Sequence, residues 1–187
     1  MRGFSLLEIM IVLALVAGIF AIGLPAIKTK ESANRKIIRE LALLGKAVRN
    51  QSRLKNMTHR IAFKMDEKEN SYWVESAQGS VLTKSKEDRK AEDHDPANPF
   101  QKTTKFFKED RVLPKKLFIG SVETESTEEA LTRGIAYIYF SPEGLIEKSV
   151  IQITDRDKMT TSLTYNPLTG HADIIEKPVH LRELRQE

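Results

Sequence analysis

The first 27 residues are almost entirely apolar. Residues 9–24 form sixteen consecutive apolar positions, and the stretch 4–27 contains a single charge, Glu8. As a helix, this stretch would be about 36 Å long, which is enough to cross the hydrocarbon core of a bilayer. Because apolar residues occupy every side of such a helix rather than one stripe, the pattern favours membrane insertion.

Three other interpretations of this segment remain open. A secretory signal peptide is the first, because the chain begins with Met1-Arg2 and Ala21-Ile22-Gly23 is a passable cleavage site. The second is an ordinary signal anchor in which Glu8 is incidental. The third is a buried core helix, which the length of the apolar run disfavours.

The pattern becomes amphipathic after Lys28 and stays so until about residue 55. Apolar residues recur at helical spacing, and charged residues occupy the other positions. We therefore expect one helix to continue from Phe4 to the middle fifties, with a kink at Pro25. The apolar positions of its second half are Ile37, Ile38, Leu41, Leu44 and Val48.

Beyond residue 58 the period shifts toward two, which predicts short strands. The charged stretch 84–95 contains one apolar residue and predicts a solvated loop within 77–115. The expected fold class is α+β, with a long N-terminal helix packed on an antiparallel β-sheet or β-sandwich. The strands are expected at 60–65, 72–75, 116–122, 135–140, 149–153, 161–165 and 171–175.

Composition narrows the classes of function. The 187 residues include 30 basic and 26 acidic residues with interleaved signs, so the net charge of +4 is weak evidence for nucleic-acid binding. The chain has no cysteine, which excludes a disulfide framework and a thiol nucleophile. Common phosphate-binding, dinucleotide-binding and hydrolase motifs do not occur, so we expect neither an enzyme nor a cofactor.

The sequence does not predict a metal site either. No pair of histidines has the spacing of zinc ligands. Asp155 and Asp157 are close in sequence, but no further array of oxygen ligands accompanies them. The histidines are His59, His94, His171 and His180.

Glu8 is unusual because a carboxylate inside an apolar membrane segment costs about 3 kcal/mol by insertion scales and needs a partner. Cleavage between Gly3 and Phe4 would create an α-amino group about one helical turn before Glu8, and this amine is mostly protonated at neutral pH. It could neutralise Glu8 within one helix or pair with Glu8 of a neighbouring subunit. In an assembly Glu8 would then set the register, since a misplaced subunit leaves a buried charge unpaired.

The run RGFSLLEIMIV, from Arg2 to Val12, resembles the cleavage and assembly motif of type IV pilins and type II secretion pseudopilins. The resemblance implies that a prepilin peptidase cuts between Gly3 and Phe4 and that Phe4 is N-methylated. It implies assembly roles for Glu8 and for Pro25, which lies where many members carry a proline. The three-residue leader is shorter and less basic than in most members.

Two later turns are similar to those of H-type minor pseudopilins and FimT-like minor pilins, which have a β-sandwich behind the N-terminal helix. These turns are Ser141-Pro142-Glu143-Gly144 and Pro167-Leu168-Thr169-Gly170, and the likeness covers residues 135–175. It implies a minor pseudopilin, a structural subunit in or near the tip of the type II secretion pseudopilus that supports protein export. The alternatives are a minor subunit of a type IV pilus, acting in adhesion, motility or DNA uptake, and a membrane-anchored binding module that does not assemble.

The resemblance also implies partners and a location. The partners would be other pilin-like subunits in a helical filament, the prepilin peptidase, an inner-membrane assembly platform and the membrane, but not nucleic acid. The protein would cross the bacterial inner membrane once, with its globular domain and the assembled filament in the periplasm. The chain would comprise a leader (1–3), a transmembrane and assembly helix (4–27), its amphipathic continuation (28–57), a globular β domain (58–176) with a flexible loop (77–115), and a C-terminal tail (177–187).

Overall fold

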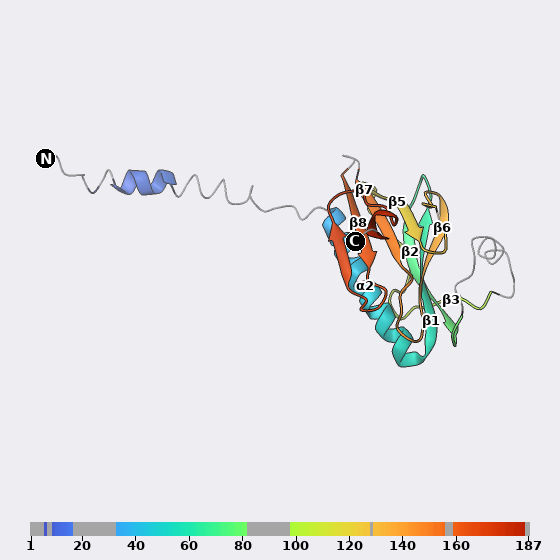
Figure 1. Ribbon diagram of the computed structural model, residues 1–187. Coiled ribbons are helices and arrows are strands. Elements are labelled where there is room, and N and C mark those ends of the chain that lie inside the picture. Colours follow the sequence, from blue (N-terminus) through green and yellow to red (C-terminus); the bar gives the residue numbers. More distant parts are fainter. Residues whose placement is uncertain are drawn as a thin grey trace. The chain divides into compact units, whose positions relative to one another are not determined.

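The computed structural model describes residues 6, 9–16, 33–81, 98–127, 129–155 and 159–185. The chain divides into two units, Met1–Ser32 and Ala33–Glu187, which we describe separately. In the first unit, residues 9–16 are helical and all of them are exposed. In the second unit, a helix and two antiparallel β-sheets form what we call the β domain (Figure 1).

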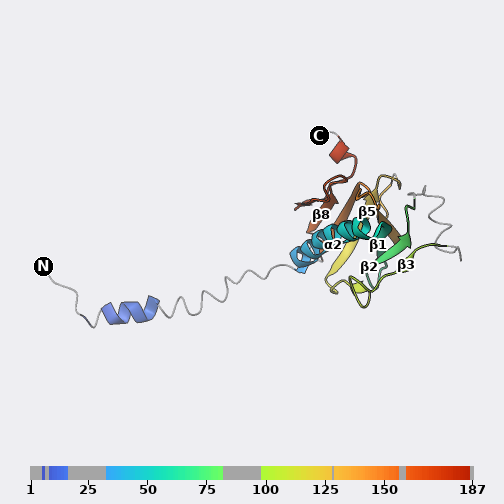
Figure 2. The ribbon, with the colours of Figure 1, turned by 90° about the horizontal axis from the view of Figure 1, so that it is seen from below.

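Helix α2 (Ala33–Lys55) buries one face on the strands of both sheets (Figure 2). It ends where Asn56 adopts a left-handed conformation with φ of 52°, a frequent way of terminating a helix. At Gly45 the helix approaches strand β8 so closely that a Cβ atom would overlap the ring of Tyr165. The side chains that α2 buries include the five apolar positions expected from the helical spacing, namely Ile37, Ile38, Leu41, Leu44 and Val48.

The prediction of one long N-terminal helix packed on the sheet in the manner of pilins is wrong. The structure describes residues 9–16 as helical, and a separate helix, α2, begins at Ala33. Packing on the sheets stabilises α2, and this stabilisation is available only where the amphipathic pattern extends. Gly23 and Pro25 precede it in the sequence, and such residues are less favourable than alanine in a helix interior by about 1 and 3 kcal/mol.

Within the described part of the chain, no helix is both long enough and apolar enough to span a membrane. A span needs about 20 predominantly apolar residues. The described apolar helical run covers residues 9–16, whereas α2 carries charged residues along its exposed face. The predicted transmembrane helix and the predicted single-pass location in the bacterial inner membrane, with a periplasmic domain, are therefore not supported, and we correct them.

Sheet A contains five strands, all paired antiparallel, in the order β3-β2-β1-β6 with β4 also beside β2. Ile61 on β1 lies opposite Val74 on β2 and Ile138 on β6, so apolar residues of three strands line up on one face. The strands are β1 (Met57–Met65), β2 (Ser71–Gln78), β3 (Gln101–Lys102), β4 (Arg111–Val112) and β6 (Gly134–Phe140).

Sheet B contains four antiparallel strands in the order β5-β7-β8-β9. A register shift between Ile119 and Ser121 allows Ile119 and Val122 to be buried in the same core although they are three residues apart. The strands are β5 (Leu117–Thr124), β7 (Ser149–Asp155), β8 (Thr160–Tyr165) and β9 (Ala172–Ile175), and a short 3-10 helix, η1 (Glu183–Arg185), follows.

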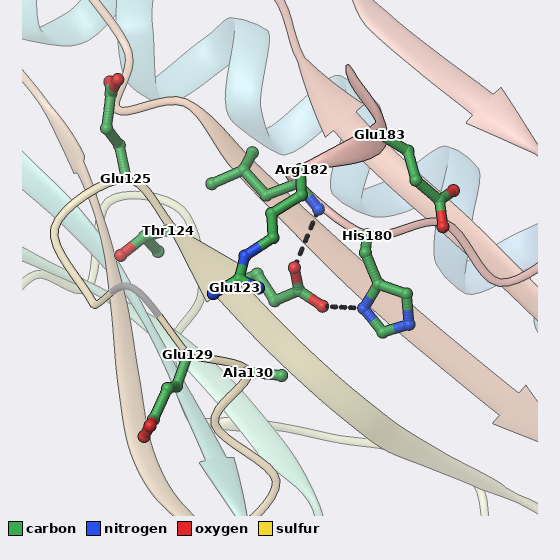
Figure 3. A pocket seen from close by; sticks show the side chains of 9 residues that line it. Glu123, Thr124, Glu125, Glu129, Ala130, His180, Arg182 and Glu183 are labelled. Carbon is green, nitrogen blue, oxygen red and sulfur yellow. Dashed lines mark hydrogen bonds and ion pairs between the residues drawn. The ribbon is translucent and has the colours of Figure 1, made fainter. Parts of the chain in front are cut away.

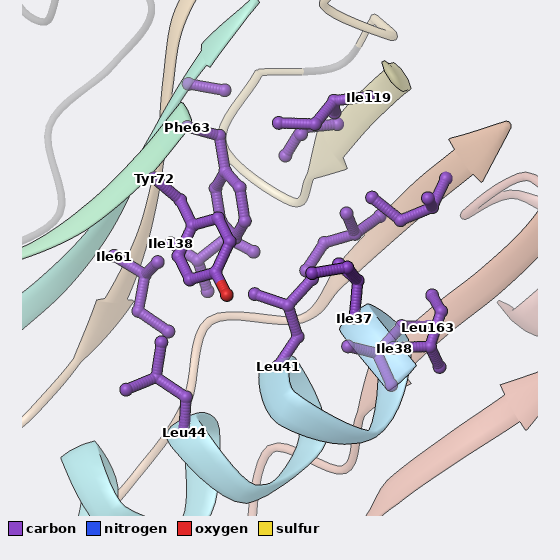
Figure 4. Packing of buried hydrophobic residues seen from close by; sticks show 14 of the residues in the cluster. Ile37, Ile38, Leu41, Leu44, Ile61, Phe63, Tyr72, Ile119, Ile138 and Leu163 are labelled. Atoms are coloured by element: carbon purple, nitrogen blue, oxygen red, sulfur yellow. The ribbon is translucent and has the colours of Figure 1, made fainter. Parts of the chain in front are cut away.

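The main hydrophobic core lies among α2 and one face of each sheet, which we call the inner faces (Figure 4). Leu41 of α2, Phe63 of sheet A and Leu163 of sheet B are each fully buried in it. The hydroxyl of Tyr165 on β8 donates a hydrogen bond of 2.6 Å to the carbonyl oxygen of Leu41, which joins sheet B directly to the helix.

The two glycine turns that carry the likeness to minor pseudopilins both contact α2. Arg49 donates a hydrogen bond of 2.7 Å to the Gly144 carbonyl and one of 2.6 Å to the Leu168 carbonyl. Gly144 and Gly170 have φ values of 85° and 71°, which favour glycine. One arginine of the helix therefore holds two turns that are far apart in sequence.

Candidate functional site

The predicted processing and assembly residues, Gly3, Phe4, Glu8 and Pro25, lie outside the described residues. Their described neighbours are residues 9–16, whose large apolar side chains are 42–64% exposed. A run of exposed apolar side chains is typical of an interaction site.

In the β domain, each sheet has a second face that does not belong to the main core. We call these outer face A and outer face B. Strand alternation and register assign the residues of each face. Outer face A comprises Arg60, Ala62, Trp73, Glu75, Tyr137 and Tyr139, and outer face B comprises Ser121, Glu123, Val150, Gln152, Ser162 and Thr164.

A cavity of about 700 Å³ lies where the end of β5 meets the C-terminal residues (Figure 3). Glu123 and His180 approach each other across it from β5 and from the end of the chain, and Arg182 and Ala130 lie nearby. The lining also includes Glu125, Glu129 and Glu183, so the cavity is acidic on balance.

Glu123 is 8% exposed, and both of its carboxylate oxygens have partners. One oxygen lies 2.6 Å from Nδ1 of His180, and the other accepts a hydrogen bond of 2.8 Å from the backbone N–H of Leu181. Such pairing is what a buried carboxylate requires. Because both oxygens are engaged, we interpret Glu123 as an anchor for the C-terminal residues rather than as a general base for a substrate.

Residues 177–184, which we call the C-terminal strap, run along outer face B. Ser162 donates to the Lys177 carbonyl at 2.7 Å and accepts from the Val179 N–H at 3.0 Å. Gln152 donates to the Val179 carbonyl at 2.9 Å. The sequence predicts a polar tail here, but Val179 and Leu181 are 4% and 7% exposed, so the strap buries apolar side chains as well.

Outer face A is closed in a different way, by aromatic rings around a buried arginine. The Arg60 guanidinium is 4.0 Å from the centre of the Phe100 ring and 3.8 Å from that of Tyr137. Its Nε donates to Glu75 at 2.7 Å, and the Trp73 indole donates to the other oxygen of Glu75 at 2.6 Å. The charge of Arg60, which is 1% exposed, is therefore compensated by a carboxylate and by π faces.

The electrostatics of Arg60 reflect this compensation. Burial alone would lower the pKa of its guanidinium, but the interactions with Tyr139 and Glu75 raise that pKa above its usual value. Arg60 therefore stays charged in the folded protein. Lys102 lies 4.3 Å from the Trp73 ring and adds a second cation to the rim of this face.

His59 marks a third polar position, between α2 and β1. It is 4% exposed, and its Nδ1 lies 3.0 Å from the hydroxyl oxygen of Ser52. Burial lowers the pKa of His59, the charge of Lys105 lowers it further, and a hydrogen bond with the Met57 backbone acts in the opposite direction. The net pKa is lowered, so the neutral imidazole is favoured.

No group of three or more His, Asp or Glu residues that could hold a metal ion is found among the described residues. Asp155 is described at the end of β7 and accepts a hydrogen bond of 3.0 Å from the Met159 N–H. Asp157 lies outside the described residues.

Sequence reasoning did not identify the polar groups of either outer face. Arg60 stands in the alternating pattern of β1, which places it opposite the inner face, but nothing nearby indicates that Phe100 covers it. Glu123 and His180 are 57 residues apart, and no local motif links them. These positions are recognised only in the folded chain, where Arg60 and Glu123 are buried although they are charged.

We compared the chain with protein-family models, with curated proteins and with solved structures, and none of these matched it. The resemblance to pseudopilins and type IV pilins therefore rests on the sequence motifs alone.

Proposed function

We propose that this chain is a structural subunit of a pseudopilin filament, a minor pseudopilin that supports protein export. The observation that carries the proposal is the run from Gly3 to Glu8, directly followed by the exposed apolar helical residues 9–16. The motif supplies a processing point and a single carboxylate. The exposed apolar residues supply a surface that needs partners.

In this proposal, function comes from packing rather than from local chemistry. Cleavage after Gly3 frees the amino group of Phe4, which pairs with Glu8 of a neighbouring subunit. The apolar residues that follow pack against the same segment of the neighbours, and the charge pair selects one register because any other leaves a buried carboxylate unpaired. The β domain then forms the outer part of the assembly. The proposed partners are other pilin-like subunits, a prepilin peptidase and an assembly platform.

The first test is the mature N-terminus of the protein, purified after expression with the other subunits and the peptidase of its own system. Peptide mass spectrometry is expected to find a first peptide that begins at N-methylated Phe4. A protein that retains Met1, or that begins near Leu24, would contradict the proposal.

The second test is assembly. Glu8→Ala is expected to prevent incorporation into filaments, because the variant lacks the carboxylate that pairs with the amine of the neighbour. Glu8→Asp keeps a carboxylate on a shorter side chain and is expected to retain part of the incorporation. The matched control is Glu69→Ala, which removes an exposed glutamate of the β domain. Equal incorporation of Glu8→Ala and the control would show that Glu8 has no assembly role.

A further inference from the structure

We propose that outer face B is a binding site for an extended peptide, and that in an assembly it takes the C-terminal strap of a second copy of this chain. Each copy would release its own strap and accept that of a neighbour. This exchange goes beyond the proposed function, because it links copies through their β domains and involves no residue before Ala33.

The first argument is that outer face B contacts mainly the backbone of the strap. Ser162 contacts the carbonyl of Lys177 and the N–H of Val179, and Gln152 contacts the carbonyl of Val179. Two further contacts, from Glu123 to the Leu181 N–H and from Lys148 to the Leu184 carbonyl, extend the row. Side chains of the face thus hold the strap by its backbone, as peptide-binding sites hold extended peptides by the main chain, and the alternate side chains are left to give selectivity.

The second argument concerns those alternate side chains. Val179 and Leu181 are both buried, while His180 between them reaches the Glu123 carboxylate. Val150, which is fully buried on outer face B, belongs to neither hydrophobic cluster of the β domain. The site therefore selects a segment with two apolar residues that flank a hydrogen-bonding residue. The strap of a second copy has this pattern and would make the same contacts.

The third argument is that the strap does not fill its site. The cavity of about 700 Å³ remains between the strap and β5. The hydroxyl oxygen of Ser121, a buried residue of outer face B, has no hydrogen-bond partner in the described part of the chain. An incompletely satisfied site holds its own strap less firmly than a fully packed one would.

The fourth argument is the connection between β9 and the strap. Only Glu176 separates Ile175, the last residue of β9, from Lys177, and Pro178 follows at once. Short connections that lead into a segment favour its exchange between copies, because opening the hinge relieves the constraint of folding back. Arg35 and Glu176 form an ion pair at this hinge, and both side chains are exposed to solvent. This pair therefore stabilises the folded-back position of the strap only weakly.

The test uses the full chain, whose lack of cysteine allows single reporters. One tagged copy carries Ala130→Cys at the groove, and a second copy with a different tag carries Arg182→Cys on the strap. Both residues are exposed and line the same cavity (Figure 3). We expect a short bismaleimide to link the two mixed copies far more than a control pair in which Lys64→Cys, an exposed residue of β1, replaces Arg182→Cys, because only an exchanged strap brings its reporter beside the groove of the other copy.

Adding Leu181→Asp to only one of the two copies distinguishes strap exchange from any other contact that could bring the two reporters together. Placed in the strap-reporter copy, it is expected to abolish the link, because that strap no longer fits the groove. Placed in the groove-reporter copy, it is expected to raise the link, because that copy empties its own groove. A synthetic peptide of residues 177–187 should compete with the unaltered strap, whereas a scrambled peptide should not.

Three results would overturn the proposal. The first is a cross-linked fraction no higher than that of the control pair. The second is the same change in cross-linking whichever copy carries Leu181→Asp. The third is that the peptide of residues 177–187 does not reduce the cross-linking. Glu8→Ala in both copies is expected to leave the link in place, so that failure of strap exchange and failure of the proposed filament function can be told apart.

Discussion

Outer faces A and B present the same physical problem and solve it differently. Each lies on the side of its sheet away from the main core, and each contains a glutamate that is 8% exposed, Glu75 on face A and Glu123 on face B. Glu75 is paired by Arg60 of the adjacent strand and by Trp73 of its own strand. Glu123 is paired by His180 and Leu181, which lie in the C-terminal strap.

The two glutamates differ in how far along the sequence their partners lie. This separation decides whether the contact can be lost without unfolding the sheet. The partners of Glu75 lie 15 and 2 residues away, within sheet A, so the pairing of strands β1 and β2 itself holds these groups together. The partners of Glu123 lie 57 and 58 residues away, in a segment that follows β9 and belongs to neither sheet. The strap can therefore detach while the sheet remains intact, as expected for a subglobal opening.

The largest expected effect comes from breaking outer face A. Arg60→Met leaves Glu75 buried without its cation and is expected to lower the free energy of unfolding by about 3–5 kcal/mol. Urea denaturation followed by Trp73 fluorescence measures this change.

Replacing both partners is the control for that prediction. Arg60→Met combined with Glu75→Leu should recover much of the loss, because no unpaired charge remains buried. A loss below about 1 kcal/mol for Arg60→Met alone would mean that the pair behaves as a surface salt bridge.

The second largest effect is expected on outer face B. Leu181→Ala leaves space under the strap and is expected to cost about 2 kcal/mol. Hydrogen exchange of the unaltered protein should give the amides of Val179 and Leu181 a lower opening free energy than the amides of β1, and Leu181→Ala should lower the strap value further. Leu168→Ala, at a side chain that is 71% exposed, is the matched control and should change neither quantity. Equal opening free energies for the strap and β1 in the unaltered protein would mean that the strap does not open separately.

A smaller effect is expected from the strap hydrogen bonds themselves. Ser162→Ala removes a donor to the Lys177 carbonyl and an acceptor for the Val179 N–H, and should cost about 1 kcal/mol. Thermal denaturation measures the loss, with the exposed Thr132→Ala as control. If Ser162→Ala also fails to accelerate exchange at Val179, the hydrogen bonds do not hold the strap.

The smallest effect is a dependence on pH that arises at His59, between α2 and β1. Burial lowers the pKa of His59, whereas a histidine in the unfolded chain titrates at about pH 6.5. As the pH falls below that value, the unfolded chain therefore binds more protons and the folded protein loses stability.

A histidine variant locates this dependence. His59→Gln should flatten the decline of unfolding free energy between about pH 7 and 5, where histidine titrates. The attribution is wrong if His59→Gln keeps the same decline as the unaltered protein.

Local patterns predicted the strands of the β domain well. The expected strands at 135–140, 149–153 and 161–165 correspond to β6 (Gly134–Phe140), β7 (Ser149–Asp155) and β8 (Thr160–Tyr165). These strands alternate and end at turn residues, so neighbouring positions suffice to identify them. The short strands β3 and β4 follow no such alternation, because each owes its two residues to pairing with β2.

The helical part was harder to predict because hydrophobicity alone does not fix where a helix continues. The uninterrupted apolar run suggested one helix from Phe4 to the middle fifties. The structure instead begins α2 at Ala33, where burial against two sheets stabilises it. The periodicity of Ile37, Leu41 and Val48 identified the buried face of α2 correctly but carried no information about residues outside that face.

The sequence by itself determined the elements of this protein: the amphipathic face of α2, most of the strands and the two glycine turns. It also contains the motif from Gly3 to Glu8 on which the proposed function rests. Tertiary structure alone decided which strands share a sheet, why Arg60 is buried, and that Glu123 holds the C-terminal strap. The physical reason is the sequence separation between the groups that interact. Periodicity and turn chemistry act between near neighbours, whereas the burial of a charge or of the C-terminal strap depends on groups that only folding brings together.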